Sequence, residues 1–330
     1  MVKPLVSFVI PVFNSERDMA RCLLSIRQLH CPESTYEVLI MDNGSTDTTH
    51  EIMRTLGFPF QVIPRVNVST LRNRGAALAR GDYLAFVDSD VELPPEWIHY
   101  GLAHLAKPQV VACGCCFPRM PPDATWVQQA WDMHQRSRQP SGTPAFVSWL
   151  PSMSFLVRRE TFQAVAGFNE ALITAEDVDL CYRLGQYGCL VSEHRMAAIH
   201  WGEDRDLGTF WRKEVWRGMG NIRGVQSHGL RWDELPSVGY PLYMLGVGLA
   251  LALGCGLAVW DDQALVALLS LGFFVLPACL LACRTAARAQ RWRATPQLGL
   301  LYFVYGLARA YAVLKSWAAT RQLPQTVTPR

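Results

Sequence analysis

Apolar residues up to position 90 follow two alternating spacings. Unbroken apolar runs rich in β-branched residues predict buried strands at 5–13, at 36–47 (where the strand ends at Asp42 in a turn), at 60–65 and at 82–90. Between these runs, apolar residues three and four positions apart predict helices at 15–29, 46–56 and 68–81. Ser15 is the expected N-cap of the first helix, and Gly81 is the expected C-terminal cap of the third.

The order of these elements predicts the fold class. Strands that alternate with helices are typical of a Rossmann-like, mostly parallel α/β sheet with right-handed crossovers. In such sheets, ligands bind beyond the carboxyl ends of the strands. Three polar segments fall at those ends, Pro11–Asn14, Asp42–Asn43 and Asp88–Asp90, and we expect them to face one crevice. No G-x-G-x-x-G follows the first strand, which disfavours a dinucleotide site.

The fourth run ends in two carboxylates, Asp88 and Asp90. Side chains two positions apart on a strand share one face, so the two charges would repel each other. Either a positive partner lies between them, or they lie on a turn that is open to water.

The middle of the chain is less regular. Prolines interrupt 108–160, and 148–172 predicts a loop, a strand, a helix and a turn. Segment 175–188 begins with acids and continues as a helix, whose dipole favours negative charge in its first turn. Segment 189–206 predicts a strand that delivers His200.

Charge and cysteine content narrow the class of protein. A formal net charge of +3 without a dense basic stripe gives no indication of nucleic-acid binding. None of the ten cysteines belongs to a pair of C-x-x-C motifs, and CGCC at 113–116 is expected to be a buried strand of small residues. Scattered thiols are typical of a reducing compartment, and the N-terminus lacks a signal-peptide pattern. We therefore expect the front of the chain to be cytoplasmic.

Hydrophobicity is concentrated in the last third of the chain. Runs 241–260 and 264–283 carry no charged side chain, and each is long enough as a helix to cross the hydrocarbon core of a membrane. The four arginines of 284–293 place that loop on the cytoplasmic side by the positive-inside rule. The predicted domains are therefore a cytoplasmic domain at 1–235 and a membrane region at 236–330.

A further apolar stretch lies at 298–317. Arg309 near its middle is costly in lipid, so we favour an interfacial or re-entrant helix, with a third crossing as the alternative. A buried helical core domain is the alternative interpretation of the whole region.

Six features in order resemble a known family. They are VIPVFN (9–14), DNGSTD (42–47), RNRGAALARGDYLAFVDSD (72–90), GFNEAL (167–172), AEDVDLCYRL (175–184) and a late histidine. In this order and at these separations they resemble the family 2 glycosyltransferases, which are inverting enzymes with the GT-A fold, over roughly residues 5–220. The appended apolar helices are similar to those of many bacterial members.

The resemblance implies a nucleotide diphosphate sugar donor and a divalent cation, Mg²⁺ or Mn²⁺, that neutralises the diphosphate. Asp90 would bind the metal, Asp88 would reach the ribose and contribute to the metal site, and His200 would be a further metal ligand. The residues that would line the nucleotide pocket are Pro11, Asn14, Glu16, Asp42 (to the base) and Arg72 (to the phosphates). An exposed helical arginine is the alternative for Arg72.

Inversion requires a carboxylate that takes the proton of the attacking hydroxyl. The resemblance gives this role to Asp177, with Glu176 supporting it or touching the acceptor. Asp179 is expected to cap the helix or to pair with a basic residue.

The Gln-x-x-Arg-Trp motif of processive relatives does not follow the acids, which favours transfer of a single sugar. The sequence therefore predicts a transferase at a bacterial inner membrane, with a UDP-sugar as the favoured donor and a lipid-linked glycan of exopolysaccharide or envelope synthesis as acceptor. A polyprenyl-phosphate glycosyltransferase and a non-catalytic membrane scaffold with a nucleotide-sugar fold are the alternatives.

Overall fold

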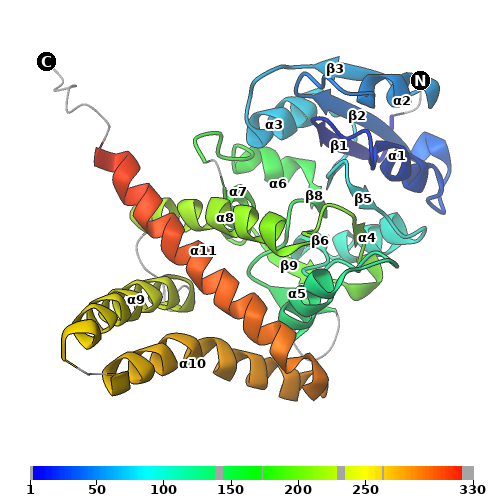
Figure 1. The fold of residues 1–330 in the computed structure, drawn as a ribbon. Coiled ribbons are helices and arrows are strands. Elements are labelled where there is room, and N and C mark those ends of the chain that lie inside the picture. Colours follow the sequence, from blue (N-terminus) through cyan, green and yellow to red (C-terminus); the bar gives the residue numbers. More distant parts are fainter. Residues whose placement is uncertain (1–2, 138–143, 173, 229–234, 262–263, 322–330) are drawn as a thin grey trace, which may run out of the picture. The chain divides into compact units, whose positions relative to one another are not determined.

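The computed structural model describes residues 3–137, 144–172, 174–228, 235–261 and 264–321 (Figure 1). Its contacts group the chain into two compact units. The first comprises Met1–Pro122 and Gln139–Glu203, and the second comprises Asp123–Arg138 and Asp204–Arg330. The division falls at 203/204, ahead of the predicted boundary at 235/236, because helix α8 (Leu207–His228) packs against the C-terminal helix α11 (Thr295–Arg321).

Within the described residues, an eight-stranded sheet forms the centre of the first unit, in the order β3-β2-β1-β4-β8-β6-β9-β7. Its strands are β1 (Val6–Val12), β2 (Tyr36–Asp42), β3 (Phe60–Val62), β4 (Tyr83–Val87), β6 (Val110–Gly114), β7 (Ala145–Val147), β8 (Ser154–Arg158) and β9 (Cys189–Ser192). Strands β1 to β4 pair in parallel, whereas β8 runs antiparallel between β4 and β6. The predicted mostly parallel α/β fold is confirmed.

Alternate side chains of the central strands enter two cores, one on each face of the sheet. The helices of this unit are α1 (Met19–Arg27), α2 (Thr49–Thr55), α3 (Val68–Leu78), α4 (Trp97–Leu105), α6 (Arg159–Ala164) and α7 (Glu176–Leu184). Phe8 and Ile10 pack with α1, α2 and α4, while Val9 and Phe86 pack with α3, α6 and α7. This double burial explains why the strands are continuous apolar runs rather than alternating ones.

The predicted N-cap of the first helix is wrong. Helix α1 begins after Asp18, and no side chain caps it. Ser15 lies one turn earlier, where its carbonyl accepts from the backbone of Met19 and its hydroxyl lies 2.6 Å from that of Ser89. Ser15 therefore links the end of β1 to the loop after β4.

The predicted C-terminal cap of α3 is also wrong. The helix ends at Leu78, with Ala79 as its cap in an extended conformation (φ −66°, ψ 134°). A Cβ at Gly81 would lie 2.8 Å from the backbone nitrogen of Ser7. Gly81 is therefore required by the close approach of the chain to β1.

The less regular middle of the chain holds elements that the sequence reasoning missed. Helix α4 follows the acid pair, and α5 (Trp126–Arg136) begins with a reciprocal capping box between Thr125 and Gln128. The Thr-x-x-Gln spacing was the available signal for α5. The CGCC segment behaves as expected in part, because Cys113 is buried in β6 and Cys115 is buried just after it.

The second unit consists of long helices. They are α5, α8, α9 (Leu235–Asp261), α10 (Ala264–Arg288) and α11. The predicted spans 241–260 and 264–283 fall within α9 and α10, and 298–317 falls within α11. In the described part of the chain, Leu271–Arg288 and Trp292–Trp317 are long and apolar enough to cross a membrane, and Val238–Leu253 forms a shorter apolar helix.

Arg309 is buried inside the helical unit. Its guanidinium is buried against α8, where Nε and Nη2 donate to Glu214 at 2.9 and 2.8 Å. The Glu214 side chain is fully buried and also accepts from Arg217 at 2.6 Å. The expected cost of a charge at this position is therefore offset by an ion pair inside the helical unit.

Candidate active site

The carboxyl ends of three neighbouring parallel strands lie at one edge of the sheet. β2, β1 and β4 are adjacent in the sheet order, and they end at Asp42, Val12 and Val87. The loops that follow carry Asn14, the 43–47 turn and the Asp88–Asp90 segment. The sequence-based expectation that these loops meet is supported by hydrogen bonds between them, including the Ser15–Ser89 contact.

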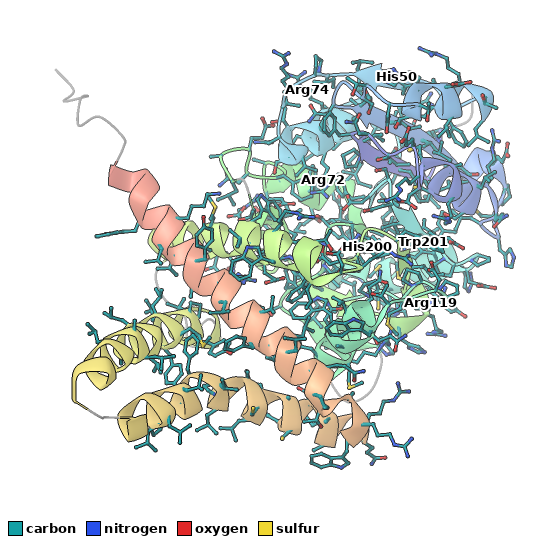
Figure 2. The ribbon with its side chains drawn as sticks, in the orientation of Figure 1. His50, Arg72, Arg74, Arg119, His200 and Trp201 are labelled. Atoms are coloured by element: carbon teal, nitrogen blue, oxygen red, sulfur yellow. The ribbon has the colours of Figure 1, made fainter. Side chains whose placement is uncertain are left out.

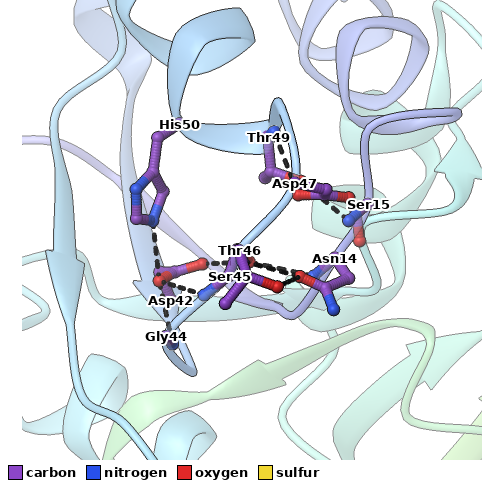
Figure 3. A network of polar contacts seen from close by, with 9 residues as sticks. All are labelled: Asn14, Ser15, Asp42, Gly44, Ser45, Thr46, Asp47, Thr49 and His50. Carbon is purple, nitrogen blue, oxygen red and sulfur yellow. Dashed lines mark hydrogen bonds and ion pairs between the residues drawn. The ribbon is translucent and has the colours of Figure 1, made fainter.

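Asp42 organises the turn that follows β2 (Figure 3). Its carboxylate is fully buried and accepts from the backbone of Gly44 and Ser45, from the Ser45 hydroxyl and from His50 Nε2 at 2.9 Å. Burial by itself raises the pKa of Asp42, but these hydrogen bonds outweigh burial and lower it. Asp42 therefore stays ionised at neutral pH and fixes the loop, and its predicted contact with the base stays a prediction.

Asn14 and Glu16 attach the β1 loop to the same turn. Asn14 lies in the left-handed region (φ 48°), and its side-chain oxygen accepts from the Thr46 backbone at 2.9 Å. Glu16 accepts from the Thr48 hydroxyl at 2.9 Å. Pro11 is buried inside β1 in register with Met41. These residues shape the rim of the strand ends, where a nucleotide pocket was predicted.

Arg72 joins two segments that lie far apart in the sequence. It projects from α3 with only 3% of its side chain exposed, and its Nη2 lies 2.7 Å from Asp88 Oδ1. Its Nη1 lies 2.9 Å from Glu176 Oε1 at the start of α7 (Figure 2 labels Arg72). The alternative of an exposed helical arginine is therefore wrong. The acid pair was expected to need a positive partner, and for Asp88 that partner is Arg72.

The second acid of the pair has a different partner. Asp90 Oδ2 lies 3.4 Å from His200 Nε2, and His200 Nδ1 lies 3.0 Å from Glu203 Oε1. Burial alone lowers the pKa of His200, but Asp90 and Glu203 outweigh burial and raise it to about 10. His200 comes from the short strand β10 (Ile199–His200), which pairs antiparallel with β5 (Val91–Glu92). The predicted strand at 189–206 is thus two short strands separated by a turn.

Helix α7 places the three predicted acids in its first turn. Asp177 is partly buried, and burial together with the neighbouring Glu176 charge raises its pKa to about 6. Ala175 precedes the helix in the left-handed region (φ 61°), which sets the direction in which α7 begins. Asp179 instead pairs with Arg183, Oδ2 to Nε at 3.0 Å, as the sequence predicts.

The donor set fits a cation that arrives with a phosphate ligand. No group of three or more His, Cys, Asp or Glu side chains arranged for a metal occurs within the described ranges. Asp90 and His200 nevertheless converge, and Mg²⁺ in nucleotide sites commonly takes one or two carboxylates, with phosphate and water completing its shell. The residues therefore fit a cation held between protein and diphosphate, and binding of that cation would displace the proton that Asp90 and Glu203 favour on His200.

The sequence did not reveal how neighbouring side chains support this pair. Trp201 donates its indole N–H to Glu92 at 3.0 Å, and the Arg21 guanidinium lies 3.7 Å from the Trp201 ring centroid. His50, which contacts Asp42, was also missed. These partners come together only in the tertiary structure, so no spacing along the sequence could predict their contacts.

Comparison with known proteins agrees with this geometry. Residues 7–165 match the family described as Glycosyl transferase family 2. Validoxylamine A glucosyltransferase of Streptomyces hygroscopicus subsp. limoneus is 29% identical over 235 residues, which span 60% of this chain and 51% of that protein. Glycosyltransferase AglE of Haloferax volcanii is 26% identical over 67% of this chain and 74% of its own length. This chain thus spans about half of the first relative.

A solved structure shares the fold. The mannosyltransferase PcManGT of Pyrobaculum calidifontis, in complex with GDP-Man and Mn²⁺, superposes with a TM-score of 0.55 at 15% identity, over 88% of this chain and 87% of that one.

Over residues 7–165 the chain matches this family of glycosyltransferases, and the solved structure shares its fold. The resemblance to glycosyltransferase family 2 is thus shown over residues 7–165, and the chain has the GT-A fold. The family resemblance of the sequence motifs is therefore confirmed, while the roles of single residues stay predictions.

Proposed function

We propose that the protein is an inverting, metal-dependent transferase that moves one sugar from a nucleotide diphosphate to a lipid-linked glycan at the inner face of a bacterial cytoplasmic membrane. The pathway would be exopolysaccharide or cell-envelope glycan synthesis. The observation that carries the proposal is the Arg72 bridge, because one side chain contacts both the Asp88 segment and the start of α7. This contact supports a site in which Asp88 would serve the donor while the adjacent start of α7 would serve the acceptor.

The donor half of the site is built from the strand-end loops. Asp90 and His200 would hold Mg²⁺ or Mn²⁺. When bound, this cation would neutralise the negative charge of the diphosphate. Asp88 would orient the ribose, and Asn14, Glu16 and Asp42 would position the loops around the base. The Pyrobaculum relative binds GDP-Man with Mn²⁺, which supports a nucleotide sugar with a divalent cation here. A uridine nucleotide is our favoured donor.

The acceptor half rests on Asp177. The acceptor hydroxyl oxygen attacks the anomeric carbon, the bond from that carbon to the diphosphate oxygen breaks, and the hydroxyl proton passes to the Asp177 carboxylate. Attack opposite the leaving group inverts the anomeric centre. A raised pKa makes Asp177 a better proton acceptor than an ordinary aspartate.

The acceptor class follows from the helical unit. Large apolar side chains on α9 and α10 are exposed, among them Leu249 (64%), Leu253 (61%) and Leu268 (65%). Such a surface favours contact with lipid, and we propose 236–330 as a membrane region that follows a cytoplasmic domain at 1–235. A lipid-borne acceptor would be confined to the same surface.

The test is turnover of the donor. Purified protein is incubated with UDP-, GDP- and dTDP-sugars, with Mn²⁺ or with EDTA, and release of the nucleoside diphosphate is measured. We expect one donor class to be consumed with Mn²⁺ only, and Asp90→Ala to abolish the reaction. If no nucleoside diphosphate binds or is released, the chain is a scaffold and the proposal is wrong.

A further inference from the structure

Residues 201 and 202 follow the predicted ligand His200 and have no role in the proposed chemistry. A Cβ built on Gly202 would lie 1.9 Å from Asp90 Oδ2 and 3.2 Å from His200 Nε2. The backbone of Gly202 is outside the left-handed region, so a positive φ is not the reason for glycine at this position. The requirement for glycine is therefore steric, and the atom that excludes a side chain is a predicted metal ligand.

The backbone around Gly202 is held firmly. β10 pairs with β5 on one side, and on the other the His200 N–H donates to the Arg119 carbonyl at 3.3 Å. The Trp201 N–H donates to the Asp90 carbonyl at 2.9 Å. A side chain at 202 therefore cannot be accommodated by moving this strand without breaking several hydrogen bonds.

The Trp201 side chain adds a second attachment. Its indole donates to Glu92, two residues beyond Asp90, and its ring lies under the Arg21 guanidinium. Arg21 is itself held by Asp18 at 2.6 Å (Figure 2 shows Trp201 beside His200). Backbone and side chain of Trp201 thus both fasten the His200 segment to the Asp90 segment.

We infer that Trp201 and Gly202 are positioning residues that bring the Asp90 carboxylate and the His200 imidazole together for a diphosphate-bound divalent cation. The inference rests on the proposed function and deepens it. Trp201 fixes the register of the two short strands, and Gly202 leaves the space that the Asp90 carboxylate occupies. In Gly202→Ala the least costly relaxation is rotation of the Asp90 side chain, which separates it from His200 while the fold is retained.

The test measures metal-dependent binding rather than turnover. Affinity for UDP, or for the diphosphate that the donor screen selects, is determined by calorimetry with Mn²⁺ and with EDTA. For Gly202→Ala we expect the Mn²⁺-dependent gain in affinity to fall by about 10- to 100-fold, the usual effect of outer-shell changes. Affinity in EDTA should be unchanged. Trp201→Phe keeps the ring under Arg21 and loses the Glu92 bond, so it should show a smaller loss of the same kind.

Gly246→Ala is the matched control, because a Cβ there meets nothing within 4 Å. It should bind as the wild type does. The inference is overturned if wild type shows a Mn²⁺-dependent gain and Gly202→Ala keeps all of it. A wild type without any Mn²⁺ dependence would instead overturn the metal part of the proposed function, and this inference with it.

Discussion

Arg72 and Glu176 lie 104 positions apart in the sequence and form an ion pair of 2.9 Å in the folded chain. The same guanidinium pairs with Asp88, so one buried cation serves two carboxylates from different motifs. Burial alone lowers the pKa of Arg72, but the two carboxylates outweigh burial and raise this pKa. The Arg72 guanidinium therefore stays positively charged. Arg72 thus ties the Asp88 segment to the start of α7.

Arg72→Lys tests this dependence. Lysine keeps the charge but cannot contact two carboxylates in a fork. We expect kcat/KM for donor turnover to fall by about 10²-fold, the effect of a small misplacement of catalytic groups. The pH profile of kcat gives a sharper readout, because Arg72 lowers the pKa of Asp177 and a displaced charge should move the acidic limb to higher pH.

Arg74→Lys is the control for that substitution. Arg74 lies on the same helix and is exposed (Figure 2 labels both arginines). Its variant should have wild-type turnover and an unchanged pH profile. Equal behaviour of the Arg72 and Arg74 variants would refute the bridging role.

The pH dependence of the wild type is a separate prediction. A base acts only when deprotonated, and Asp177 has a pKa of about 6 because of burial and the Glu176 charge. Turnover should therefore fall as the pH drops through about 6, whereas an ordinary aspartate would place this limb near about 4. The measurement is kcat between pH 4.5 and pH 8 at saturating Mn²⁺ and donor. A flat profile down to the lower end of this range would remove Asp177 from the role.

The ion pair inside the helical unit should contribute strongly to stability. Glu214→Gln leaves the buried Arg309 without its charged partner, and breaking such a pair costs about 3–5 kcal/mol. Unfolding of the purified protein in detergent measures this loss. Asp132→Asn breaks the pair with the more exposed Arg136 and should cost less than about 1 kcal/mol. Similar stability of the two variants would mean that the Glu214 pair is not a structural anchor.

The proposed membrane topology rests on four arginines at the end of α10 and just after it. Arg284, Arg288, Arg291 and Arg293 are exposed, and no acidic residue follows Asp262 in the sequence. An impermeant maleimide should label Ala289→Cys in inverted membrane vesicles and Gln263→Cys in right-side-out vesicles. Labelling of both positions from the same side would support the alternative of a buried helical core domain.

The fold was largely predictable, because its information is local. Strands β1 to β4 were recognised from runs such as 5–13 and 82–90, in which both faces are buried. The caps at Ser15 and Gly81 were mispredicted because tertiary contacts, with Ser89 and Ser7, decide both positions. The cost of burying Arg309 was estimated for a lipid environment alone, because the sequence could not reveal Glu214 as its partner.

The sequence could predict which residues belong to the candidate site, but it could not predict which of them contact one another. The order of the motifs predicted Asp88 and Asp90 as donor-site acids and Asp177 as the base. It could not show that Asp88 faces Arg72 whereas Asp90 faces His200. Asp90 and His200 lie about 110 positions apart, and Arg72 lies 16 positions before Asp88 on a different element. Spacing along the chain encodes neither pairing.

Separation of donor binding from turnover in Asp177→Asn tests the central claim most directly. Asparagine keeps the size of the side chain and cannot accept the proton. Donor affinity with Mn²⁺ should equal that of the wild type, while kcat for transfer should fall by about 10²- to 10⁴-fold. Wild-type kcat in this variant would contradict proton removal by Asp177 and would point to an acceptor, such as a lipid phosphate, that needs no base.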